Sequence, residues 1–423
     1  MATNRVHAKQ MRDLAEHIGT NITTVSATPT VKITHAGASQ SVPLPQSGLP
    51  VKRPSPPTNQ LPPAPPPPAA QDGPPVGSSK PGTSTEDSPE KQPSRMIRMQ
   101  GKIPAYDFII SLSRLTDSAF PSSVLNIYEQ FRMVSHVWEV MAMERRSGQV
   151  HSIGRYFPHR RLDSIMVFCP TCPEPGFNME KGWERTPEHL RHLNQTLRTL
   201  DGNHHINKTR KNTDPNDVCI LGPNGYFPTM GHYRKVLQEM LNMPEEKSVC
   251  NYLKAHNKQA TDKFKNMEYS GVIAVCCSHV FIQAMVNMLA GERYPLADLA
   301  YALAIESTNH ECPRDFKPPA EILSYDCTCQ YSVNLLDHME KLHPQLAPRI
   351  QKLRATIPYV HINDHLDDCM YLFCTVYMIC ARHFHGETAE HPWAESNGIG
   401  PMTRQMNGGH HEEILNGHNN DWN

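Results

Sequence analysis

A proline-rich stretch without aromatic residues occupies the first quarter of the chain and limits what can fold. Of the 38 prolines in the 423 residues, 17 lie between Pro43 and Pro93, and residues 1–100 contain no Phe, Tyr, Trp or Cys. Such a segment cannot bury enough apolar surface to offset the entropy lost on ordering. We therefore expect residues 1–95 to form a disordered tail with local polyproline II character, and the remainder to hold one large core.

The formal net charge is −1, because 41 Lys and Arg residues nearly balance 42 Asp and Glu residues. A chain with this balance lacks a positive field over its whole surface, so any contact with DNA must come from local basic patches. The candidate patches are Lys208, Arg210 and Lys211, and the group Arg155, His159, Arg160 and Arg161. Solvated loop charge is the alternative interpretation of both patches.

The cysteine distribution and the apolar runs indicate an intracellular protein. All twelve cysteines follow Phe168, and no N-terminal segment has the basic and then apolar pattern of a secretory signal. The apolar run from Met370 to Ala381 is too short to span a bilayer. We therefore expect reduced thiols, no membrane contact, and a nuclear or cytosolic location.

Hydrophobic periodicity predicts a mixed α/β core. Residues 122–146 are predicted to form a helix that ends at Gly148, and its apolar stripe is predicted to be its packing face. The stripe consists of Val124, Ile127, Phe131, Val134, Trp138 and Met141. Strands are predicted within 165–168, 192–200, 270–281, 321–330 and 357–362, and helices at 297–305 and 331–342. On the strand at 321–330, alternation places Ser324, Asp326 and Thr328 on one face.

Three acidic motifs are spread over this core. Asp201 lies in a Leu-Asp-Gly-Asn sequence at the end of a predicted strand, and Asp326 lies in Ser-Tyr-Asp-Cys-Thr-Cys-Gln. Glu387 and Glu390 are three residues apart in Gly-Glu-Thr-Ala-Glu-His-Pro-Trp, a spacing that places both on one helix face. Two aspartates on strands and a glutamate on a later helix suit a two-metal phosphodiester-cutting site, because Mg²⁺ prefers oxygen ligands.

Two Cys and His motifs have the spacing of zinc ligands. Cys169 and Cys172 form a CxxC pair, which is half of a zinc site. His361, His365 and Cys369 are spaced four apart and would project from one face of a helix, with His383 or His385 as a possible fourth ligand. Core thiols and imidazoles are the alternative for both motifs.

The sequence motifs around these residues resemble those of the KDZ (Kyakuja–Dileera–Zisupton) DNA transposases, which are common in fungal genomes. The resemblance extends in order over roughly residues 100–423. It rests on Cys169–Asn178, Asp201–His204, Glu246–Asn251, Gly291–Tyr294, Ser324–Gln330, Pro358–Cys369 and Gly386–Trp393, and continues through Asn397, Arg404, Met406 and Asp421–Asn423.

The resemblance implies an α/β fold with an RNase H-like catalytic core and helical or zinc-type insertions. It divides the chain into a tail (1–95), a helical segment (96–160) and a transposase domain (161–423) with an insertion around 331–385. Asp201, Asp326 and Glu390, or Glu387, would hold two Mg²⁺ or Mn²⁺ ions for cleavage and strand transfer at transposon ends. Arg404 and Trp393 would contact DNA, although Trp393 is also expected to pack its helix onto the sheet. An active enzyme would act in the nucleus as a homo-oligomer.

The chain departs from the family pattern at several positions. His204 stands where Phe is usual, Ser278 where Arg is usual, and His410 and His411 at a place where Arg is common. Fewer basic contacts would weaken the grip on DNA. The alternative function is therefore a truncated, inactive or domesticated transposase that binds DNA or protein without cutting. A zinc-dependent hydrolase that uses His361, His365 and Cys369 is a third hypothesis.

Overall fold

The computed structural model describes residues 91–212, 214, 217–243, 250, 266–289, 291–308, 319–381 and 383–423. The predicted disordered tail falls almost entirely outside the described residues. Its predicted end at residue 95 falls within the helix α2 (Lys91–Gly101). None of the described helices is long and apolar enough to cross a bilayer.

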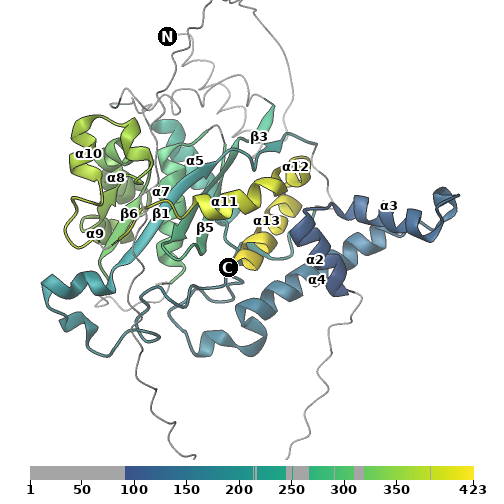
Figure 1. Ribbon diagram of the computed structural model, residues 1–423, viewed down its shortest axis with the longest axis horizontal. Helices are drawn as coiled ribbons and strands as arrows, with labels where there is room; N and C mark the ends of the chain where they lie inside the picture. Colours follow the sequence, from purple (N-terminus) through teal and green to yellow (C-terminus); the bar gives the residue numbers. More distant parts are fainter. Residues whose placement is uncertain are drawn as a thin grey trace, which may run out of the picture. The chain divides into compact units, whose positions relative to one another are not determined.

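A five-stranded mixed sheet forms the centre of the fold (Figure 1). Its strands are β1 (Thr196–Asn203), β4 (Gly271–Cys277), β5 (Ile282–Met288), β6 (Glu321–Ser324) and β7 (Arg354–Thr356). Their order across the sheet is β5-β4-β1-β6-β7. The pairs β5–β4 and β4–β1 are antiparallel, whereas β1–β6 and β6–β7 are parallel. The central strand β1 therefore joins an antiparallel half to a parallel half.

Helices cover both faces of the sheet. One face packs against α5 (Met230–Asn242), α7 (Tyr294–Glu306) and α8 (Thr328–Leu342). Since α7 is buried all round, its sequence is apolar on every side. The other face packs against α11 (Glu390–Ser396) and α13 (Gly408–Trp422), and α4 (Tyr128–Ser147) lies against α13. Successive side chains of β4 point to opposite faces of the sheet, so that Ile273 packs in the first hydrophobic layer and Ala274 in the second.

Short elements connect this framework. The further α-helices are α3 (Ala105–Thr116), α9 (Ala347–Ile350), α10 (Asp367–Phe373) and α12 (Gly400–Thr403), and a small second sheet pairs β2 (Lys208–Thr209) with β3 (Met267–Tyr269). Single 3₁₀ turns occur at Pro121–Ser123, Gln149–His151, Ile153–Arg155, Trp183–Arg185, Gly222–Asn224, Pro344–Leu346, His361–Asp364 and Asn397–Ile399, and a longer one at Glu188–Asn194.

The predicted packing face of α4 is wrong. The helix begins at Tyr128 and ends before Gly148, which has a positive φ of 81° as a C-terminal cap requires. Much of its predicted stripe faces solvent, with Val134 exposed by 50% and Met141 by 53%, whereas Phe131 is half-buried and stacks on Phe108 of α3. The buried residues are instead Glu139, Val140 and Met143. The sequence stripe failed because α4 packs through a mixed polar and apolar face, on which Glu139 pairs with two arginines of α2.

Two predicted strands are absent at their predicted positions, and a third is shorter. Residues 165–168 join no sheet, and side chains bind their backbone: Asn420 donates to the Ile165 carbonyl and Asn423 to the Val167 carbonyl. Residues 357–362 follow β7 and enter a 3₁₀ turn. Strand β6 ends at Ser324, so the predicted alternation through Asp326 and Thr328 does not occur.

Candidate active site and metal centres

Three alternate side chains of β1 hold the helix α11 against the sheet. Thr199, Asp201 and Asn203 point to the same face because a strand has a side-chain period of two. Their hydrogen-bond partners are Thr388 at 2.7 Å, Trp393 at 2.7 Å and Asn397 at 2.8 Å, respectively. The Trp393 indole donates to Oδ2 of Asp201 and its ring is buried in the core. The motif with Glu387 and Glu390 is thereby fixed over β1.

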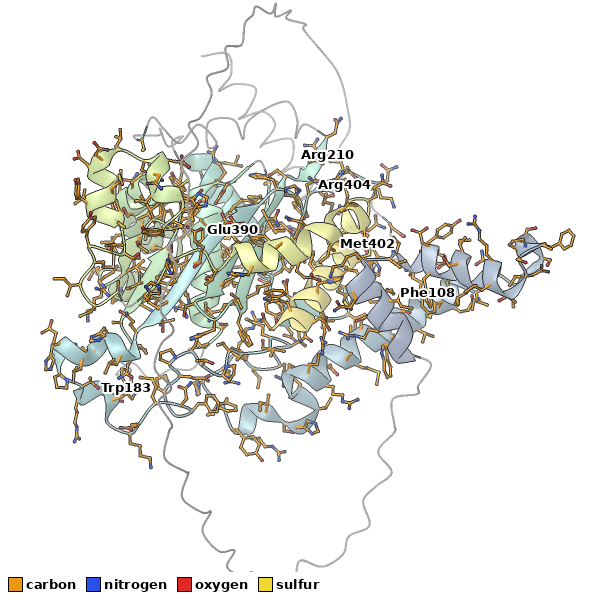
Figure 2. All side chains as sticks on the ribbon, in the orientation of Figure 1. Phe108, Trp183, Arg210, Glu390, Met402 and Arg404 are labelled. Carbon is orange, nitrogen blue, oxygen red and sulfur yellow. The ribbon has the colours of Figure 1, made fainter. Side chains whose placement is uncertain are left out.

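The candidate catalytic carboxylates line one pocket. Asp201 lies on β1, and Asp326 lies two residues beyond the end of β6, the neighbouring parallel strand. Glu387 precedes α11, and Glu390 is its first residue (Figure 2). All four side chains border the same pocket, together with His361. The structure therefore brings together the three acidic motifs that the sequence separates.

Gly386 explains how the third motif reaches the first two. Its φ of +75° is unfavourable for other residues, and a Cβ there would meet the Ser324 hydroxyl and lie 2.8 Å from the Ser324 Cβ. Glycine thus lets the loop before α11 pass directly over the end of β6. This approach places Glu387 and Glu390 beside Asp326.

Buried negative charge collects at this end of β1. Burial, followed by the charges of Asp326 and Glu292, raises the pKa of Asp201 well above its usual value. Burial and then Asp326 raise the pKa of Glu292 to about 8. The Oδ1 atom of Asp326 is buried without a hydrogen-bond partner among the described residues. A cation would compensate this charge and give the orphaned oxygen a partner, so the donor set fits a divalent metal.

Sequence reasoning missed Glu292 as a site residue. Its Oε1 accepts a 2.6 Å hydrogen bond from the Tyr325 hydroxyl, and a Cβ at Gly202 would lie 2.6 Å from its Oε2. Glu292 therefore sits directly behind the Asp201–Gly202 segment. The Gly291–Tyr294 motif contains Glu292, but the motif alone did not indicate that this carboxylate faces the site.

Glu387 and Glu390 have different surroundings. Oε1 of Glu387 accepts a 2.7 Å hydrogen bond from the Val360 amide, and its Oε2 lies 3.7 Å from Nε2 of His361. Glu390 is exposed at the first turn of α11. Glu387 is thus engaged in holding the pocket wall at 360–361, whereas the carboxylate of Glu390 faces the open side.

The CxxC pair is completed by Cys277, the last residue of β4, and by His279 in the turn between β4 and β5. Cys169, Cys172, Cys277 and His279 have ligand atoms that all lie within 4.8 Å of one another. Nδ1 of His279 is 3.6 Å from Sγ of Cys169 and 3.5 Å from Sγ of Cys172. Ligand atoms of a tetrahedral zinc ion with bonds of about 2.0–2.3 Å lie roughly 3.5 Å apart. This group, the hairpin cluster, could hold a structural zinc ion.

A second group lies beside Asp326. The members of this pocket cluster are Cys250, Cys329, His365 and Cys369. Nδ1 of His365 lies 3.4 Å from Sγ of Cys329 and 3.7 Å from Sγ of Cys250, which again fits zinc. The cluster corrects the predicted ligand set, because His361 is directed to Glu387 and lies outside it, as do His383 and His385. The reason is local: the chain leaves the 3₁₀ turn at an extended His365, so 361–369 is not one helix.

The predicted DNA contacts divide into accessible and inaccessible residues. Lys208 is buried and paired with Glu268, and Trp393 is packed in the core, so neither offers a free surface to DNA. Arg210 and Lys211 are exposed. Arg404 lies next to them, since its carbonyl accepts from Thr209, and Figure 2 shows Arg210 and Arg404 together. The second predicted patch is largely engaged internally: Arg160 and His159 bind Glu174, and Arg161 binds the Gly225 carbonyl.

Comparison with known proteins identifies the family. The family model of the Kyakuja-Dileera-Zisupton (KDZ) transposase matches residues 194–423, which is more than half of the chain. No curated protein and no solved structure matches the sequence. The matched region begins just before β1 and includes all four carboxylates of the pocket. The chain therefore belongs to the KDZ transposase family.

Proposed function

We propose that the protein is a DNA transposase that cuts and joins phosphodiester bonds at transposon ends with two divalent metal ions. The observation that carries this proposal is the single pocket lined by Asp201, Asp326, Glu387 and Glu390. The sheet supports it, because three antiparallel strands followed by two parallel ones, with the first acid on the central strand, is the order expected of an RNase H-like core.

In this proposal Asp201, Asp326 and Glu390 hold Mg²⁺ or Mn²⁺. When bound, two such ions would activate the attacking oxygen and stabilise the leaving oxygen. Trp393 orients Asp201 through its indole N–H, and Glu387 positions the loop at Val360. Among described residues the four carboxylates are not a tight group of the kind formed by the cysteine clusters. Acids that hold different ions of a pair need not be close together.

The remaining parts of the site have supporting roles in the proposal. Zinc in the hairpin and pocket clusters would stabilise the loops that carry them. Arg210, Lys211 and Arg404 would contact the DNA backbone beside the pocket. Work on chromosomal DNA implies a nuclear location, and cutting two ends together implies a homo-oligomer.

The test is cleavage of DNA that carries the inverted repeats flanking the gene. Wild type should nick this DNA with Mg²⁺ or Mn²⁺, and Asp326→Asn should not, while both bind it with similar affinity. Asp337→Asn, at an exposed position on α8, is the matched control and should cleave normally. Equal cleavage by wild type and Asp326→Asn would overturn the proposed site. DNA binding without cleavage by wild type, with both metals tried, would favour the inactive relic.

A further inference from the structure

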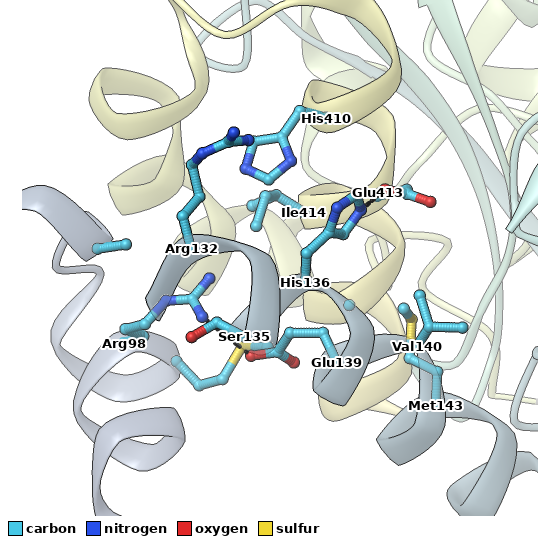
Figure 3. Close-up of a pocket in the computed structure, with 13 residues that line it drawn as sticks. Arg98, Arg132, Ser135, His136, Glu139, Val140, Met143, His410, Glu413 and Ile414 are labelled. Atoms are coloured by element: carbon cyan, nitrogen blue, oxygen red, sulfur yellow. Dashed lines mark hydrogen bonds and ion pairs between the residues drawn. The ribbon is translucent and has the colours of Figure 1, made fainter. Parts of the chain in front are cut away.

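The helices α4 and α13 bring three metal-ligating side chains into one cavity (Figure 3). His136 comes from α4, and His410 and Glu413 come from α13. One ligand atom of each lies within 4.8 Å of the other two. His410 and Glu413 are three residues apart and so project from one helix face toward the facing helix. The arrangement is separate from the catalytic pocket and from both cysteine clusters.

The carboxylate of Glu413 is held in place by the backbone. Its Oε1 accepts hydrogen bonds from the amides of Ile220 and Leu221, the second at 2.9 Å. Its Oε2 is thereby turned toward Nε2 of His136, with which it forms a short contact. Metal-binding carboxylates are typically oriented by such outer hydrogen bonds. Glu413 is therefore preorganised with one oxygen available to a ligand.

His410 supplies the third donor. Its ring meets the His136 ring edge to face, with centroids 5.1 Å apart. Its ring nitrogens have no hydrogen-bond partner among the described residues, whereas its backbone amide donates to Asp217. The cavity measures about 30 Å³, and a single water needs about 10–15 Å³. The cavity is therefore large enough to hold an ion with one water.

The neighbouring arginines do not exclude a cation. Arg98 lies 3.4 Å from Glu139, and Arg132 lies 3.1 Å from Glu129, so each positive charge has a carboxylate partner. The rest of the lining is mainly apolar, with Val140, Met143 and Ile414. Two imidazole nitrogens and one carboxylate oxygen in such a place suit zinc and similar transition metals better than Mg²⁺.

We propose that His136, His410 and Glu413 form a site for a divalent transition-metal ion of the zinc type, with one open position for water. Binding replaces the hydrogen bond between His136 and Glu413, and the proton of that bond leaves to solvent. His136 precedes the family-matched region and the other two ligands lie within it. The ion would therefore fasten the N-terminal helices to the transposase domain through α4 and α13.

The experiment uses full-length protein whose cysteine clusters are already filled with zinc, titrated with Co²⁺. Cobalt bound by thiolates absorbs strongly through charge transfer, whereas cobalt bound by imidazole and carboxylate shows only weak visible bands. Wild type should take up one Co²⁺ without the thiolate band beyond any bound by the catalytic carboxylates, which the His410→Gln variant retains unchanged. His410→Gln should weaken this uptake at least about tenfold. His151→Gln, at an exposed position, is the control and should bind as wild type does.

A second measurement tests whether the ion stabilises the contact between α4 and α13. Added Zn²⁺ should slow amide hydrogen exchange in α4 of wild type and leave His410→Gln unchanged. Glu413→Gln keeps an acceptor for Ile220 and Leu221, so it tests the ligand role with the fold preserved. Equal Co²⁺ uptake by wild type and His410→Gln, or thiolate-type spectra alone in folded wild type, would overturn the proposal.

Discussion

The two halves of β1 both carry buried charge but compensate it differently. At the start, Arg198 bonds with Gln283 and Glu321, and Arg349 also binds Glu321. Although burial opposes ionisation, the two arginines hold the pKa of Glu321 below its usual value. Three residues later, Asp201 is half-buried beside other acids, and burial together with their charges raises its pKa.

This difference separates a structural from a functional use of the same strand. A buried ion pair with satisfied partners is a stable part of the framework. Buried groups of like charge are costly and cluster at functional sites, and under the proposed function this group marks the place for a cation. The two zinc-type clusters are divided between the same two regions. The hairpin cluster lies near the start of β1, because Cys277 pairs with Arg198 in the sheet. The pocket cluster lies near the acidic end, because Cys329 is three residues beyond Asp326.

The largest expected effect is on stability at the start of β1. Arg198→Met leaves Glu321 buried with one partner and should lower the free energy of unfolding by about 3–5 kcal/mol. Asp201→Asn, measured without added Mg²⁺, should cause no loss, because it removes repulsion. Urea unfolding of both variants checks the prediction. Similar losses in the two would show that the halves do not differ.

The two clusters should differ in their effect on cleavage. Cys329→Ser should lower the cleavage rate about 10–100-fold, because the pocket cluster lies beside Asp326. Cys172→Ser, also at a partly buried cysteine, should lose one zinc ion as well but change the rate much less. Zinc content and single-turnover cleavage are measured on both proteins. A large rate loss in Cys172→Ser would break the comparison.

The acidic half of β1 should make stability depend on pH. Glu292 has a folded pKa of about 8, above its ordinary value of 4.5, so the native state binds more protons between these values. Stability should therefore fall as the pH rises toward 8, by up to about 1.4 kcal/mol per pH unit. Glu292→Gln should flatten the dependence, and so should added Mg²⁺, which favours the ionised carboxylates. Unfolding at several pH values tests this, and an unchanged slope in the variant would contradict it.

The smallest expected effect concerns the hydrogen bond to Asp201. Trp393→Phe keeps most of the buried ring but removes the indole donor, so stability should fall by about 1 kcal/mol and cleavage by a few fold. Trp183→Phe, in a 3₁₀ turn away from β1, is the control and should behave as wild type in both assays. A change in stability without a change in cleavage would show that Trp393 only packs the helix.

The sequence predicted those features that depend on local hydrophobic pattern or on short sequence motifs. Strands β1 and β4, the helices α7 and α8, and the gathering of Asp201, Asp326 and the Glu387–Glu390 motif belong to this class. The packing face of α4 was not predictable from apolar spacing, since its buried side contains Glu139 and His136 contacts a distant helix.

The local sequence pattern also could not predict ligand residues that come from distant segments. Cys277 and His279 complete the hairpin cluster about one hundred residues after Cys169, and Cys250 and Cys329 complete the pocket cluster from two other segments. Only the sheet topology brings these segments together. His361 was misassigned because a spacing of four was interpreted as a helix, whereas the chain is extended at His365.

The alternate bonding of Thr199, Asp201 and Asn203 to the α11 region sets a limit on how this gene can change. Removing or adding one residue within β1 would turn the opposite side chains toward the helix, so that Leu200 would face Trp393 and Asp201 would enter the apolar layer. Substitutions at single positions keep this phase, but insertions and deletions destroy it. We therefore expect β1 to tolerate changes of residue far better than changes of length.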